Sequence, residues 1–157
     1  MEDIAEKAAR LLKEAIDVHI HTAPDIFPRS VDDIEAAAQA LSVGMKAIVI
    51  KNHFEPTVAR ARIASKVVKG IHVFGGIVLN HEVGGFNPAA VNNAVKLGAK
   101  IVWMPTISAR HFLECMTIEF FSKALPKSKR GLTILGKSGE ILPEVEEILQ
   151  IIADENV

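Results

Sequence analysis

Four short apolar runs, each rich in β-branched residues, recur along the chain at intervals of 25 to 30 residues, and a helical pattern follows each one. The runs cover residues 16–20, 46–50, 71–79 and 100–104. That interval is typical of a βα unit. Strands that are apolar throughout are typical of parallel sheets buried on both faces. The alternation therefore predicts an α/β fold built on a parallel sheet.

The helical patterns lie between these runs and at both ends of the chain. Ser30 and Ser108 are suitable N-caps for two of the helices, and a proline stands at the start of three others. We expect helices over residues 4–15, 32–43, 56–70, 88–98, 108–123 and 143–155.

Four βα units amount to half of an eight-fold barrel. We therefore expect a TIM-barrel-like partial (half) barrel that occupies residues 1–157 as a single domain, with a small β-hairpin near 132–142. The alternative is an open, doubly wound sheet. We favour the barrel because the glycine pairs at 75–76 and 84–85 do not form a GxGxxG phosphate loop. Gly75 and Gly76 are expected to permit a bulge or a close approach in the third strand.

Composition excludes several classes of partner. Net charge is −1, with 18 basic and 19 acidic residues, which argues against nucleic acid or an anionic membrane. No run of 18 apolar residues predicts a membrane span, and the charged, amphipathic N-terminus does not resemble a secretory signal. Cys115 is the single cysteine, so an internal disulfide and a cysteine-based zinc site are excluded. A cytoplasmic location is expected.

Five of the six histidines fall where the predicted strands end. His19 and His21 are two apart at the end of the first strand, so they should project in the same direction and grip one metal ion. The other three follow the ends of the next strands, on the rim where (β/α) barrels carry their active sites. His72 lies at the opposite end of the third strand and is interpreted as structural.

These positions predict a metal centre with a substrate pocket around it. His19 and His21 are the predicted ligands and His53 is a candidate third ligand, whereas His81 and His111 are candidate substrate contacts or supports for the ligands. Each histidine taken alone is more often a solvated residue than a ligand.

Charged residues near the same rim are further candidates. Lys51 can be carboxylated and bridge two metals, bind an anionic substrate group, or extend to water. Asp25 is a possible local base, although loop aspartates usually cap turns. Arg29 and Arg110 are candidate clamps for an anionic substrate group, with solvation as the alternative.

The segment DVHIHTAPD, residues 17–25, resembles the opening strand of the amidohydrolase superfamily, in which Asp-x-His-x-His marks the metal site. It also resembles, more distantly, the first motif of the polymerase-and-histidinol-phosphatase (PHP) family. The whole chain is similar to the amino-terminal half of a family of uncharacterised amidohydrolase-like proteins. That wider likeness rests on DVHIHTAPD, IVIKNH, GGIVLNHEVGGFNP, VWMPT and LTILGKSGEILPEV.

The resemblance implies a distorted (β/α)₈ barrel with a divalent metal and water as the nucleophile. Zinc is the first expectation, with manganese or iron as alternatives. His19 and His21 match the first ligand pair of the superfamily, and His53 matches a PHP-type position after the second strand. Two departures stand out: residues 103–106 end the fourth strand without a ligand, and the strands that would supply later histidines and the general-base aspartate do not occur in these 157 residues.

The resulting hypothesis is a metal-dependent hydrolase that attacks a C–N, C–O or related bond of a small-molecule substrate. One alternative is a PHP-like phosphoesterase. Another is a non-catalytic, truncated half-barrel. A four-stranded parallel sheet leaves two unpaired edges, and self-association is the simplest way to cover them. We therefore expect a homo-oligomer.

Overall fold

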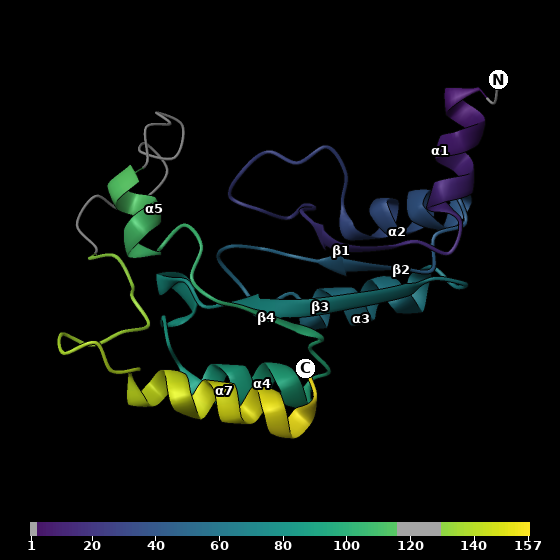
Figure 1. Cartoon of the computed structure of the whole chain (residues 1–157). Coiled ribbons are helices and arrows are strands. Elements are labelled where there is room, and N and C mark those ends of the chain that lie inside the picture. The colour runs from purple at the N-terminus through teal and green to yellow at the C-terminus, as the bar shows by residue number, and fades with distance from the viewer. Residues whose placement is uncertain (1–2, 116–129) are drawn as a thin grey trace.

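A computed structural model describes residues 3–115 and 130–157 and shows an α/β fold around one parallel sheet (Figure 1). The sheet has four strands in the order β1-β2-β3-β4. Their bounds are β1 Ile16–Ile20, β2 Ala47–Ile50, β3 His72–Val78 and β4 Ile101–Trp103. Each predicted strand is therefore confirmed, with bounds that differ by a few residues.

The strand order distinguishes between the two predicted architectures. Each strand pairs in parallel with the next strand along the chain. A doubly wound sheet reverses its strand order at a switch point, and this sheet has no such reversal. The four strands form a curled half-barrel sheet that alternates with helices along the chain. Because the strands are parallel, all four end at the same rim of the sheet.

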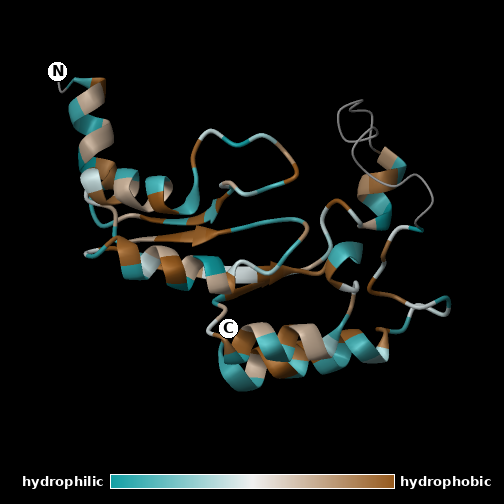
Figure 2. Ribbon diagram, turned by 180° about the vertical axis from the view of Figure 1, so that it is seen from behind, coloured by the Kyte–Doolittle hydropathy of each residue, from teal (hydrophilic) through white to brown (hydrophobic). Residues whose placement is uncertain are grey.

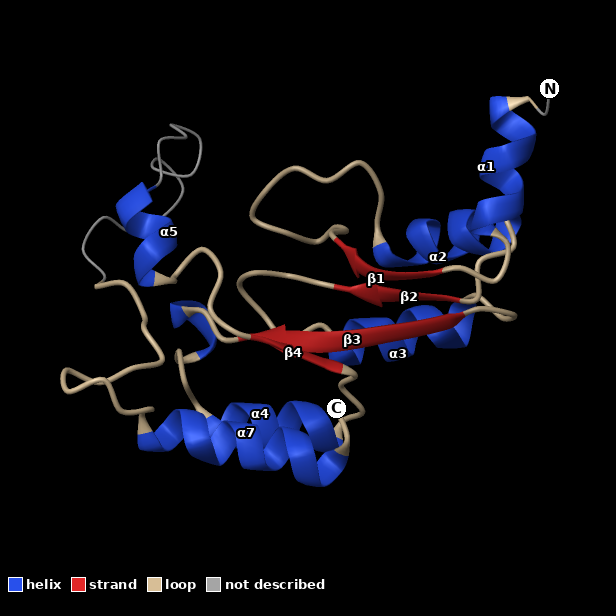
Figure 3. Cartoon of the chain, viewed as in Figure 1, coloured by secondary structure: helices blue, strands red, loops and turns tan. Residues whose placement is uncertain are grey.

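Helices follow the strands and cover one face of the sheet (Figure 3). Helices α2 and α3 pack against the sheet, and α7 packs along α4. Residues 116–123 of the predicted fifth helix lie outside the described residues. The observed helices are α1 Ile4–Leu12, α2 Asp33–Ser42, α3 Val58–Val67, α4 Pro88–Lys96, α5 Arg110–Cys115 and α7 Pro143–Glu155, with a short 3₁₀ helix η1 at His81–Val83.

Two apolar clusters lie between the sheet and these helices. The first joins Ile48, Ile50 and Val73 of the strands to alanines of α2 and α3. The second joins Ile77 of β3 to residues of α4 and to Ile148 of α7. Because alanine side chains are short, α2 and α3 can approach the sheet closely. The face that these clusters cover is the outer face of the half-barrel, and the opposite face is its inner face.

Gly75 and Gly76 both sit where another group approaches the strand closely. A Cβ on Gly75 would lie 2.6 Å from the backbone of Thr57 and Val58, at the start of α3. A Cβ on Gly76 would lie 2.3 Å from the carbonyl oxygen of Ile101 and 2.7 Å from the Trp103 ring. The predicted close approach is confirmed, and the register of β3 with its neighbours runs without a bulge.

Two predicted helix caps are wrong. The N-cap of α2 is Asp32, whose carboxylate accepts from the backbone N–H groups of Ile34 and Glu35 while the Glu35 side chain accepts from the Asp32 N–H. This capping box satisfies more donors than Ser30, two residues earlier, could reach. Ser108 lies one residue before the N-cap position of α5, which begins at Arg110, and its hydroxyl accepts the backbone N–H of His81.

Strand β1 departs from the expected core. An apolar run of this kind predicts burial on both faces, yet Ile16 and Val18 are 52% and 55% exposed. Strand β1 is an edge strand, with a paired neighbour on one side only among the described residues. Helix α1 projects beyond this edge with no buried residue, although its apolar and polar residues lie on separate faces (Figure 2).

The predicted hairpin is present in a minimal form. Leu135 and Ile141 form one antiparallel bridge, and the N–H of Gly136 donates to the carbonyl of Glu140. Gly139 has a φ of 92°, which suits glycine in the turn.

Among the described residues, none of the helices combines the length and the apolar character that crossing a membrane requires.

We predict that Gly76→Ala destabilises the protein by about 3 kcal/mol, because the added methyl group collides with backbone as well as with Trp103. Gly98→Ala is the matched control. No heavy atom lies within 4 Å there, so only its φ of 99° opposes a side chain, at about 1 kcal/mol. Urea unfolding measures both free energies, and equal losses would contradict the close packing at Gly76.

Candidate functional site

Two imidazoles meet at the end of β1. The Nε2 atoms of His19 and His21 are 3.2 Å apart, and their ring centroids are 5.1 Å apart. His19 is exposed to solvent and His21 is partly buried. The two side chains therefore converge, as their spacing in the sequence predicts.

The backbone of β1 reaches this arrangement through an irregularity. Asp17 pairs with Ile48, and Ile20 pairs with Ile50, so three steps along β1 match two along β2. The extra residue is a β-bulge, which re-aims side chains near it. Asp17 therefore occupies an outer-face position, and its carboxylate accepts from the backbone N–H of His19 at 2.9 Å. Regular alternation would place Asp17 on the same face as the two histidines, and the bulge removes it from that face.

His53 lies beside this pair. It follows β2, and its ring centroid is 4.7 Å from that of His21. Its Nδ1 atom lies 2.9 Å from the hydroxyl of Thr106, which follows β4. Among the described residues, no hydrogen-bond partner contacts Nε2 of His53. The predicted role of His53 as a metal ligand stays a prediction.

Lys51 places a cation on the inner face next to the imidazoles. The residue is only 4% exposed, and its Nζ lies 5.1 Å from the centroid of the Trp103 ring. No carboxylate in residues 3–115 or 130–157 pairs with this ammonium. A cation held over an aromatic face is attracted by the ring, yet it keeps the capacity to bind an anion.

The site holds its imidazoles in the neutral form. Burial, followed by the charge of the neighbouring His53, lowers the pKa of His21 to about 4. Burial and then the charge of Lys51 lower the pKa of His53 to about 4. The same two causes lower the pKa of His19, against an opposing effect of Asp17. Neutral imidazole is the form that binds metal ions.

Asp25 and Arg29 are occupied with each other in the loop between β1 and α2. The Asp25 side chain is fully buried and its Oδ2 lies 2.7 Å from Nη2 of Arg29. The same carboxylate accepts the backbone N–H of Phe27. As a base, Asp25 would have to leave this ion pair. The roles predicted for both residues stay predictions.

Arg60 of α3 is a residue that sequence reasoning missed. Its guanidinium donates to the carboxylates of Asp33 and Glu55, and to the backbone carbonyls of Thr22 and Pro24. These contacts anchor the loop that begins at His21. A single arginine in a helix gives no local signal of this role, since its partners are 5 to 38 residues away.

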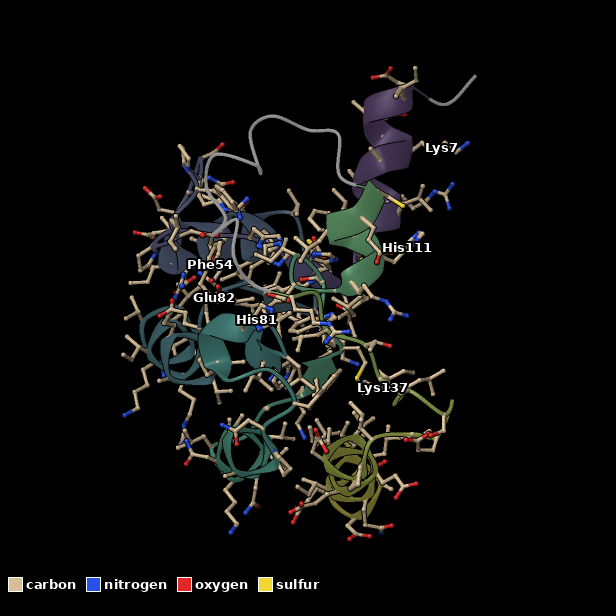
Figure 4. The ribbon with its side chains drawn as sticks, turned by 90° about the vertical axis from the view of Figure 1, so that its left-hand side faces the viewer. Lys7, Phe54, His81, Glu82, His111 and Lys137 are labelled. Atoms are coloured by element: carbon tan, nitrogen blue, oxygen red, sulfur yellow. The ribbon has the colours of Figure 1, made fainter. Side chains whose placement is uncertain are left out.

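The remaining predicted residues make their contacts elsewhere on the rim, which Figure 4 views from the ends of the strands. His81 begins η1, and its Nε2 donates to the carbonyl of Arg130. His111 lies on α5, is exposed, and has the sulfur of Cys115 at 3.7 Å. Arg110 is also exposed, 4.0 Å from Glu114. The structure does not bring these three to the His19–His21 pair, and their predicted substrate contacts stay predictions.

The pair fits part of a metal site. Two nitrogens bound to one tetrahedral zinc at about 2.1 Å lie about 3.4 Å apart, close to the 3.2 Å between the two Nε2 atoms. Among the described residues, Nδ1 of His21 is buried without a hydrogen-bond partner, so this ring nitrogen is not engaged by another protein group. Across the described parts of the chain, no group of three or more His, Cys, Asp or Glu side chains is arranged to hold a metal. The geometry therefore supplies two converging ligands.

A family model described as "Family of unknown function (DUF6282)" matches residues 14–157. The searches of curated proteins and of solved structures gave no match.

We predict that the metal-free protein loses stability as the pH falls from about 6.5 to about 4. The unfolded chain takes up protons on His21 and His53 near pH 6.5, whereas the folded chain does so only near pH 4. The stability that depends on neutral His21 and His53 is therefore fully present above about pH 6.5 and is lost as the pH falls towards about 4. Urea midpoints measured in a chelator should fall across this window, and His21→Asn should make the fall shallower. A midpoint that does not change between pH 6.5 and 4 would contradict the buried, neutral state.

Proposed function

We propose that this chain, which belongs to the DUF6282 family, is a metal-dependent, amidohydrolase-like hydrolase. The single observation that carries the proposal is the 3.2 Å separation of the His19 and His21 Nε2 atoms. The divalent metal is zinc in the first instance, with manganese or iron as alternatives. The proposed substrate is a small molecule with a hydrolysable C–N, C–O or related bond.

The residues around the pair have separate parts in this proposal. When bound, a divalent ion would supply a water activated for nucleophilic attack near neutral pH. His19 and His21 hold the ion through neutral imidazoles, whose lone pairs burial and the Lys51 charge keep available. Lys51, which has no carboxylate partner in the described structure, binds an anionic group of the substrate. Trp103 holds the Lys51 side chain in place.

We also propose that the half-barrel is of the TIM-barrel type and that its C-terminal rim is the active face. Sequential parallel strands with helices outside support this proposal. So does the resemblance of DVHIHTAPD to the opening strand of amidohydrolases. A cytoplasmic location is proposed on the free, exposed thiol of Cys115.

A PHP-like phosphoesterase is the second candidate, and Lys51 favours it. An ammonium that has no carboxylate partner among the described residues, and that lies beside neutral imidazoles, suits a phosphate ester as well as a carboxylate. The two candidates differ in the substrates that turn over. Hydrolysis of generic phosphate esters with manganese or zinc would support the phosphoesterase, whereas hydrolysis of amides or carboxylic esters alone would support the amidohydrolase.

We propose in addition that the protein is a homo-oligomer. Apolar side chains on α1 and on the edge strand β1 remain exposed, among them Leu11 at 63% and Val18 at 55%. An exposed apolar strip beside an unpaired strand edge favours association. A half-barrel that associates without catalysis is the remaining alternative, and it predicts no metal at the histidine pair.

We predict that the wild-type protein binds zinc and that His19→Ala combined with His21→Ala removes this binding. The loss should exceed the roughly 10–100-fold that removing a supporting partner of a ligand costs. Isothermal titration calorimetry and metal analysis measure it. His72→Ala combined with His111→Ala is the matched control, because these two histidines lie outside the pair. Equal zinc binding by both double variants would overturn the proposal.

We predict an oligomer at micromolar concentration, measured by light scattering. Leu11→Glu combined with Val18→Glu should yield a monomer, because two charges would then lie in the apolar strip. Ile63→Glu is the control: it introduces charge at an equally exposed apolar position, on α3. A monomeric wild-type protein would refute self-association.

A further inference from the structure

The buried Asn80 side chain at the end of β3 has an amide orientation fixed by backbone groups. Its Oδ1 accepts the backbone N–H of Thr106 at 2.9 Å and of Ser108 at 3.2 Å. Its Nδ2 donates to the backbone carbonyl of His53 at 3.0 Å. Backbone N–H groups only donate and carbonyls only accept, so the amide cannot be turned over. The second Nδ2 contact, 3.0 Å to the Thr106 hydroxyl, must therefore be a donation by Asn80.

This donation occupies one of the two acceptor sites of the Thr106 hydroxyl and turns attention to where its proton goes. Having accepted from Asn80, the hydroxyl has one proton to donate. Nδ1 of His53 lies 2.9 Å away, while the other acceptor, Oδ1 of Asn80, lies at 3.5 Å. A hydrogen bond of 3.5 Å between oxygens is well beyond the usual range. Among the described acceptors, Nδ1 of His53 is the one within the usual range, so a Thr106 hydroxyl that satisfies its proton within the structure donates to Nδ1, and Nδ1 then carries no proton.

A neutral imidazole with a bare Nδ1 carries its proton on Nε2. We propose that His53 presents this Nε2–H as a hydrogen-bond donor to a substrate oxygen, in place of the metal-ligand role that its sequence position predicts. A ligand must offer a lone pair, and a protonated Nε2 has none. This inference rests on the proposed hydrolase function for its substrate, but the proton assignment rests on hydrogen bonding alone.

The place of His53 suits such a donor. Its ring lies against His21, 4.7 Å between centroids, so the donor is one ring away from the converging Nε2 pair. Hydrolysis of a carbonyl or phosphoryl group develops negative charge on an oxygen, and a fixed N–H donor stabilises that charge. Asn80 and Thr106 are positioning residues, because they set the proton on His53 without touching the substrate.

The arrangement also accounts for a buried amide at this rim. Asn80 is fully buried, and it joins the segment after β2 to the loop after β4. A buried amide stabilises the fold only when its donors and acceptors are matched. Here the four shorter hydrogen bonds of the Asn80 side chain also serve to fix the state of His53.

The test is long-range ¹H–¹⁵N NMR of histidine-labelled full chain near pH 7, without metal and after addition of zinc alone. We expect His53 in the Nε2–H form in both samples, with zinc changing the nitrogen signals of His19 and His21 only. Thr106→Ser retains the hydroxyl and should retain the tautomer. Thr106→Val removes the donor and should give a mixture of the two tautomers.

Each outcome decides between the inference and the function on which it rests. An Nδ1–H form of His53 in the metal-free protein, or a zinc-induced loss of its Nε2–H signal, overturns the donor role while leaving the metal proposal intact. No change at His19 and His21 on adding zinc overturns the metal proposal, while the metal-free tautomer still decides the proton position. Should Thr106→Val fail to fold, Thr106→Ser and the wild type carry the test.

Discussion

Parallel pairing of each strand with the next along the chain is the constraint on which the candidate site depends. It brings the ends of four strands, about 25 to 30 residues apart in sequence, to one rim. Helices can then cover only the outer face, because every crossover has the same hand. The inner face is left to Lys51, Trp103 and the imidazoles, and Gly76 leaves room for the Trp103 ring.

Buried polar side chains hold that rim together. Asn80 connects the segments that follow β2 and β4, and Arg60 connects α3 to the loop after β1. An isolated buried amide or guanidinium is costly, but one with several matched partners can fix a loop in one arrangement. The loops that carry His21, His53 and Thr106 are therefore tied to the sheet by specific contacts rather than by apolar packing alone.

Charge and burial act in the same direction at the histidine cluster. Burial disfavours a charged imidazole, and the cation of Lys51 adds to the effect on His19 and His53. A cluster of imidazoles that stays neutral offers lone pairs and N–H groups at physiological pH. The positions of the protons then decide which ring binds a cation and which ring donates to an oxygen.

The sequence by itself determined the strands, the helices and the convergence of two histidines. Strand and helix periodicity are local properties, so residues 16–20 and the pair at His19 and His21 could be identified from spacing. The cap at Asp32 was also local, and its Glu35 partner three residues later was a usable signal that Ser30 obscured.

Only the tertiary structure decided the strand order, the β-bulge after Asp17, the exposure of Ile16 and Val18, and the hydrogen-bond partners of His53 and Arg60. Each of these depends on groups tens of residues apart in the chain. Spacing along one strand indicates which way a side chain points, but what it meets there depends on which strand, loop or open edge the fold brings beside it.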